Sequence, residues 1–63
     1  MLTDATTRTI DSMTPAQLLR LYNRIYDRIG RGWDHPTLRI VHPHIYAVLM
    51  AMSLRYRKIT TAG

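Results

Sequence analysis

The pattern of apolar and polar residues predicts two helices of different character. From Pro15 to Ile29, apolar side chains recur every three or four residues, as in a helix with one buried face. Thr14 and Gln17 have the spacing of a capping box, and Pro15 suits the first helical position. Gly30 is the residue type that most often follows a helix end. We therefore expect a helix with these bounds.

The second helix, predicted over residues 43–59, is apolar around most of its circumference, and Pro43 suits its first position. One apolar stripe matches the face of the first helix and consists of Ile45, Val48, Leu49, Met52, Tyr56 and Ile59. A second stripe lies about opposite and consists of Ala47, Met50 and Leu54. Because a helix that is hydrophobic on every side needs neighbours on every side, this short chain has more apolar surface than it can easily cover.

This surplus of apolar surface predicts association. We expect the second stripe to contact another protein or a second copy of the chain. Trp33, in the turn between the helices, is expected either to join that interface or to close the end of the helical pair. The intramolecular alternative is that residues 1–13 fold back over the stripe, although Leu2 and Ile10 are their only large apolar anchors before Met13. This segment is expected to be a short helix, an arm, or a strand that pairs only on association.

The fold expected from these elements is a single all-α domain, a small helical hairpin with helices over 15–29 and 43–59. Residues 30–42 are expected to form an irregular connection, because their first part is rich in turn residues. The apolar run 37–41 is too short to separate a strand from a helical turn. A chain of 63 residues supports one domain at most.

Charge adds a second feature to this picture. Eight Arg and one Lys stand against four Asp and no Glu, which gives a formal net charge of +5. Arg20, Arg24 and Arg28 recur at every fourth position on the side of the first helix opposite its apolar face, and Arg31 follows them. Because guanidinium groups bind carboxylates and phosphates through two hydrogen bonds, this basic face predicts binding to an acidic partner. A solvated helix face is the alternative.

Residue chemistry argues against an enzyme or a metal site. The chain has no cysteine, which excludes disulfides and thiolate zinc sites. His35, His42 and His44 with Asp34 offer possible ligands, but His42 and His44 are two residues apart and would point to different helix faces. The sequence has neither a nucleophilic cysteine nor a glycine-rich phosphate loop. We predict no catalysis, cofactor, metal or small-molecule substrate.

The favoured function is that of a small interaction protein that modulates, inhibits or assembles with another protein. Small size without an active site is typical of regulators encoded by viruses or mobile elements. The longest apolar run is about half of the roughly 20 residues that cross a bilayer, and the N-terminus lacks a signal-peptide pattern. We therefore expect a cytoplasmic location and no membrane partner.

A DNA-binding homodimer is the alternative function. The order of an N-terminal arm, the helix Thr14–Gly30 and a second helix that starts with His44–Met50 loosely resembles ribbon-helix-helix repressors. That resemblance implies a strand in the arm, dimerisation and DNA as the partner. Tyr22 and Tyr26, at the rim of the apolar face, would either stack on bases or pack in the core.

Overall fold

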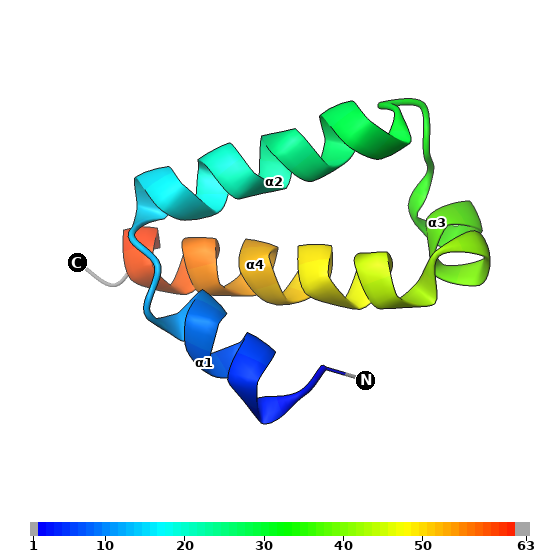
Figure 1. The fold of residues 1–63 in the computed structure, drawn as a ribbon. Helices are drawn as coiled ribbons and strands as arrows, with labels where there is room; N and C mark the ends of the chain where they lie inside the picture. The colour runs from blue at the N-terminus through cyan, green and yellow to red at the C-terminus, as the bar shows by residue number, and fades with distance from the viewer. Residues whose placement is uncertain (1, 62–63) are drawn as a thin grey trace.

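The computed structural model describes residues 2–61, and every regular element within that range is helical (Figure 1). The helices are α1 (Asp4–Asp11), α2 (Pro15–Ile29), α3 (His35–Val41) and α4 (Pro43–Thr61). The all-α prediction is confirmed, and both long helices lie where they were expected, with α4 continuing past residue 59. Because residues 2–61 contain no strand, the strand implied by the ribbon-helix-helix resemblance is not there.

Local capping groups set both ends of α2. The Thr14 hydroxyl accepts a hydrogen bond from the Gln17 backbone at 3.2 Å, and the Gln17 side chain accepts one from the Thr14 backbone at 3.0 Å. At the other end, Gly30 has a φ of 95°, in the range that favours glycine. Its N–H donates to the Tyr26 carbonyl at 2.9 Å. The helix therefore begins and ends as its local sequence predicts.

The third helix corrects one expectation. Residues 30–42 were predicted to be irregular, and this is wrong for His35–Val41, which form α3. The Asp34 carboxylate accepts hydrogen bonds from the Thr37 backbone at 3.2 Å and from the Thr37 hydroxyl at 3.0 Å. Pro36 lies in the first turn. A capping aspartate and an early proline both favour helix initiation, so the irregular part of this connection is limited to residues 30–34 and to His42.

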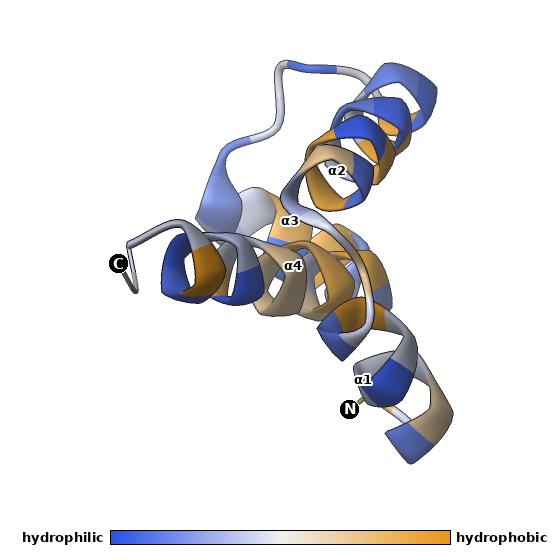
Figure 2. Cartoon of the chain, turned by 90° about the vertical axis from the view of Figure 1, so that its left-hand side faces the viewer, coloured by the Kyte–Doolittle hydropathy of each residue, from blue (hydrophilic) through white to orange (hydrophobic). Residues whose placement is uncertain are grey.

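The central element of the fold is α4, because α1, α2 and α3 all pack on it. In Figure 1, α2 runs antiparallel to α4, so the two form the expected hairpin, and α3 lies at the end where the chain turns back. The side view in Figure 2 places α2 above α4 and α1 below it, with the hydrophobic side of α2 facing α4. The apolar circumference of α4 is thus covered in part by several helices of the same chain, and Leu54 is left exposed.

The core is small and divided. Ile10 of α1, Leu18 of α2 and Met52 of α4 form one buried cluster. Leu38 of α3 and Leu49 of α4 are also fully buried but lie outside that cluster. Since α3 packs chiefly on α4, Leu38 is buried against that helix.

The N-terminal segment is a short helix that is attached to α4 by two kinds of contact. Ile10 joins the buried cluster, and the Arg55 guanidinium donates a hydrogen bond to the Asp11 carbonyl at 3.0 Å. A cation at the C-terminal end of a helix interacts favourably with the helix dipole and satisfies a carbonyl that has no helical partner. Of the alternatives for this segment, the structure shows the helix.

A candidate partner-binding groove bordered by arginine

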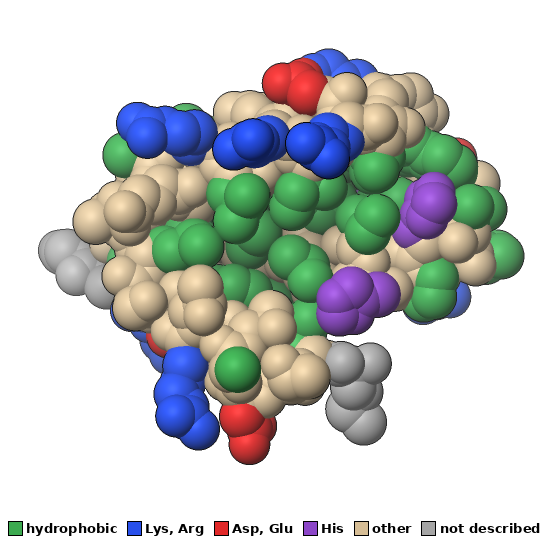
Figure 3. Space-filling view, in the orientation of Figure 1, with side chains coloured by type: hydrophobic (Ala, Val, Ile, Leu, Met, Phe, Trp, Pro, Cys, Tyr) green, Lys and Arg blue, Asp and Glu red, His purple; other side chains and the backbone are tan. Residues whose placement is uncertain are grey.

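An open groove runs along one face of the molecule between α1, α2 and α4. It consists of three adjoining hollows, which are joined by shared lining residues: Val48 in one pair, and Thr9, Met13 and Leu21 in the other. The apolar lining is aliphatic throughout and comprises Ala5, Ile10, Met13, Leu21, Ile25, Ile29, Ile45, Val48 and Met52. In Figure 3 this face appears as a band of hydrophobic side chains between α2 and α4.

One border of the groove is positively charged. Arg20 and Arg24 line the hollow between α1 and α2, and Arg28 lines the hollow next to the start of α4, where His44 also contributes. Figure 3 shows this border as a row of Lys or Arg side chains along α2, directly above the hydrophobic band. Among the residues that line these three hollows none is acidic. We call this feature, with its aliphatic floor and the row Arg20, Arg24 and Arg28, the arginine groove.

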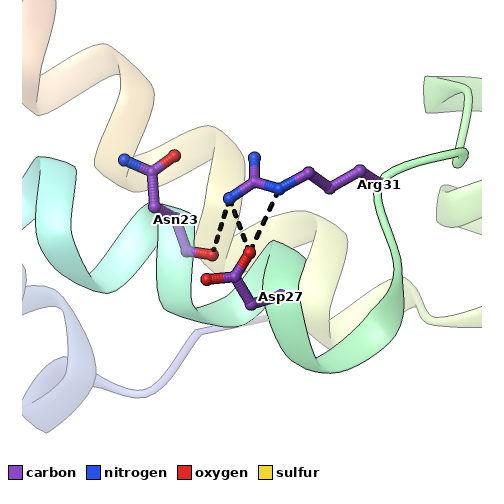
Figure 4. Close-up of polar contacts among 3 residues, drawn as sticks. All are labelled: Asn23, Asp27 and Arg31. Atoms are coloured by element: carbon purple, nitrogen blue, oxygen red, sulfur yellow. Dashed lines mark hydrogen bonds and ion pairs between the residues drawn. The ribbon is translucent and has the colours of Figure 1, made fainter.

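The three arginines of the groove have no acidic partner in the described part of the chain. Within residues 2–61 the structure has one ion pair, between Arg31 and Asp27, at 2.7 Å. Arg31 folds back over the end of α2, where its guanidinium donates twice to Asp27 and once to the Asn23 carbonyl at 3.4 Å (Figure 4). Asp27 is the only acidic residue of α2. The one carboxylate of α2 is therefore paired with Arg31, and the Arg31 guanidinium is bound within its own chain.

The geometry of a helix explains how a basic row reaches an apolar groove. A step of four residues advances about 40° around the axis, because each residue turns by about 100°. The row from Arg20 to Arg28 therefore winds towards the apolar face, and Arg28 lies only about 20° from Leu21. The arginines were expected on the side of the helix opposite its apolar face, so this border was not predicted. The small angle between Arg28 and Leu21 on the helix was the feature of the sequence that could have predicted the basic border.

The residues predicted to mediate association do not line the arginine groove. Trp33 is half-buried, and its indole N–H donates to the Ile29 carbonyl at 2.6 Å. Its ring lies edge-on to His42, with centroids 5.3 Å apart, so it closes the end of α2 against its own chain. On α4, Ala47 and Met50 are half-buried. Leu54 is 64% exposed.

A further hollow between α2 and α4 shares only Met52 with the groove lining, and its tyrosines are Tyr22 and Tyr56. Its lining consists of Leu18, Leu19, Tyr22, Met52, Ser53 and Tyr56. The rings of Tyr22 and Tyr26 are tilted against each other, with centroids 5.1 Å apart. Burial raises the pKa of Tyr26, and the neighbouring Tyr22 raises it further. The aromatic side chains of α2 are thus not part of the arginine groove.

Two of the three histidines pack on aromatic rings. Besides the contact of His42 with Trp33, His35 lies edge-on to Tyr46 with centroids 6.1 Å apart. Within residues 2–61, no three histidine or acidic side chains are close enough together to hold a metal ion. Across the same residues, no helix has the length and apolar character needed to cross a bilayer.

Comparison of the chain with protein-family models, with curated proteins and with solved structures finds no match.

Proposed function

We propose that this chain is a small non-enzymatic interaction protein that binds an acidic partner protein, as a modulator, inhibitor or assembly subunit. The observation that carries the proposal is the row Arg20, Arg24 and Arg28, which has no acidic partner in residues 2–61 and borders an aliphatic groove. Guanidinium groups pair with carboxylates in two-point geometry, and an aliphatic floor buries apolar side chains. Both features serve one ligand if that ligand is an acidic protein with an apolar face.

The lining of the arginine groove supports a protein partner over nucleic acid. Proteins that bind single strands stack the bases chiefly on Phe, Tyr and Trp side chains, and the described groove lining contains none of these three residue types. Phosphate contacts would use the arginines and leave the aliphatic floor without a role. The DNA-binding homodimer stays the alternative, now without the N-terminal strand on which the resemblance depended.

The test compares two charge reversals in capture experiments from native cytosol, with and without nuclease. Arg24→Glu places a negative charge in the middle of the groove border. Arg39→Glu makes the same change at an exposed position of α3 that does not line the groove. Because an opposed like charge costs several kcal/mol in an interface, we expect Arg24→Glu to reduce capture of the partner at least about tenfold. Arg39→Glu and nuclease treatment should leave it unchanged.

Two results would contradict the proposal. If Arg24→Glu captures the same protein as the parent chain, the arginine row is an ordinary solvated face. If capture disappears with nuclease, nucleic acid is the partner. In that case log affinity should fall with log salt by about 0.9 for each phosphate contact.

A further inference from the structure

We propose that the arginine groove receives a single acidic amphipathic helix of the partner protein. The inference rests on the proposed function, and it adds the conformation and charge pattern of the segment that is bound. Three features of the groove support it: the spacing of its floor, the sign of its border and the state of its backbone.

The floor has the spacing of a helix surface. Leu21, Ile25 and Ile29 line it from α2 at intervals of four residues, which is about 6 Å along the axis. Ile45 and Val48 line it from α4, three residues apart. An amphipathic helix presents apolar side chains at the same intervals, at positions i, i+3, i+4 and i+7. A guest helix lying along α2 would therefore find a matching set of apolar contacts.

The border specifies the charge of the guest. Arg20, Arg24 and Arg28 repeat at about 6 Å, so carboxylates at every fourth position of a guest helix can face successive guanidinium groups. A second copy of this chain is a poor guest, because each copy has a net charge of +5. Charge complementarity thus points to a different, acidic chain.

The backbone around the groove favours a helical guest over an extended one. An extended peptide leaves its own N–H and C=O groups unpaired unless it joins a sheet edge or finds similar donors. The groove is bordered by α1, α2 and α4, whose backbone groups are used within the helices, and residues 2–61 contain no strand. A guest helix pairs its backbone groups internally and needs only side-chain contacts.

The test titrates the full chain, with labelled methyl groups, with a synthetic peptide of about 15 residues, a length that gives marginal helicity. The peptide has Leu on one face and Glu at every fourth position beside it, and a control peptide has the same composition with its amphipathic order scrambled. We expect saturable shifts at the methyl groups of Leu21, Ile25 and Val48, and none at Leu19 or Leu54. The scrambled peptide should bind at least about tenfold more weakly.

Substitutions of the chain then test the border. Replacing Arg20, Arg24 and Arg28 together by Gln should weaken peptide binding about tenfold, since each exposed pair contributes little by itself. Arg39→Gln, which removes one charge outside the groove, should change the affinity less than twofold by the same reasoning. These arginines are exposed, so the folded state should survive the replacement.

Four outcomes would overturn the inference. The amphipathic peptide fails to bind saturably, the scrambled peptide binds equally well, or the methyl shifts centre on Leu19. The fourth is that a single-stranded oligonucleotide displaces the peptide and causes the same methyl shifts. The two proposals fail separately. If the peptide does not bind but Arg24→Glu still abolishes capture from cytosol, the helical guest is wrong and the acidic protein partner stands. If Arg24→Glu does not affect capture, the proposed function is wrong.

Discussion

Through Asp34, the stability of the start of α3 depends on pH. Its carboxylate accepts two hydrogen bonds from Thr37, and both stabilise the charged form. The side-chain and backbone hydrogen bonds from Thr37 lower the pKa of Asp34 below its ordinary value of 3.8. A carboxyl group whose pKa is lower in the folded state stabilises that state above its unfolded pKa. This stabilisation is lost as the pH falls through the folded value.

We expect Asp34→Asn to flatten the acid limb of the stability profile. Asparagine keeps an acceptor for the helix N-terminus but does not titrate. As the pH falls below about 4, the free energy of unfolding should therefore fall less steeply than in the parent chain. Urea unfolding at a series of pH values measures this. Asp11→Asn controls for the loss of one carboxylate, and equal slopes for all three chains would show that the cap does not titrate with folding.

Single residues were predictable where their partners are close in sequence. Thr14, Gln17 and Gly30 were placed correctly, because each acts within four residues of itself. The hydrogen bond from Arg55 to Asp11 spans 44 residues and depends on how α1 docks. Trp33 had two interpretations of equal weight, and its bond to Ile29 favours the structural one.

Among the elements, α3 is the helix that the apolar pattern of the sequence did not predict. The run 37–41 is shorter than two helical turns, so its apolar period is undefined. The local signals, Asp34 as a cap and Pro36 in the first turn, were present in the sequence but were interpreted as parts of a turn. The groove was beyond prediction for a different reason, since one of its walls belongs to α1, whose position follows only from tertiary packing.

Two substitutions within α3 test how the helix is held. Leu38 is fully buried, whereas Ile40 is 77% exposed. Leu38→Ala should lower the free energy of unfolding by about 2–5 kcal/mol, because it leaves a cavity against α4. Ile40→Ala should change it by less than about 0.5 kcal/mol. Urea unfolding followed by circular dichroism compares them. Similar losses for both variants would mean that α3 is not anchored through Leu38.

At the scale of the whole molecule, the prediction of association assumed too few helices packed on α4. The expected hairpin had two helices, and a short helix over residues 1–13 was one of three alternatives, so α4 appeared to lack neighbours. The observed α1 and α3 also pack on α4, and Ala47 and Met50 of α4 are half-buried. Leu54 keeps its exposed position, so association through that part of α4 stays a prediction.

The divided core predicts that α1 and α3 respond separately to mutation. Ile10 is in the cluster with Leu18 and Met52, whereas Leu38 is not. Ile10→Val should therefore reduce the hydrogen-exchange protection of α1 amides by about 0.5–1.5 kcal/mol and leave α3 unchanged. Arg8→Ala, an exposed change on the same helix, should affect neither. An equal loss in both helices would show that the core unfolds as one unit.

The position of α1 has one more consequence. Thr9 of α1 and Arg24 of α2 line the same hollow, so a ligand that fills it touches both helices at once. By thermodynamic linkage, a ligand that binds there also stabilises the docked position of α1. At a concentration of a hundred times its dissociation constant, the ligand stabilises the conformation that it binds by about 2.7 kcal/mol. Resistance of α1 to a protease would then report occupancy, before the identity of the ligand is known.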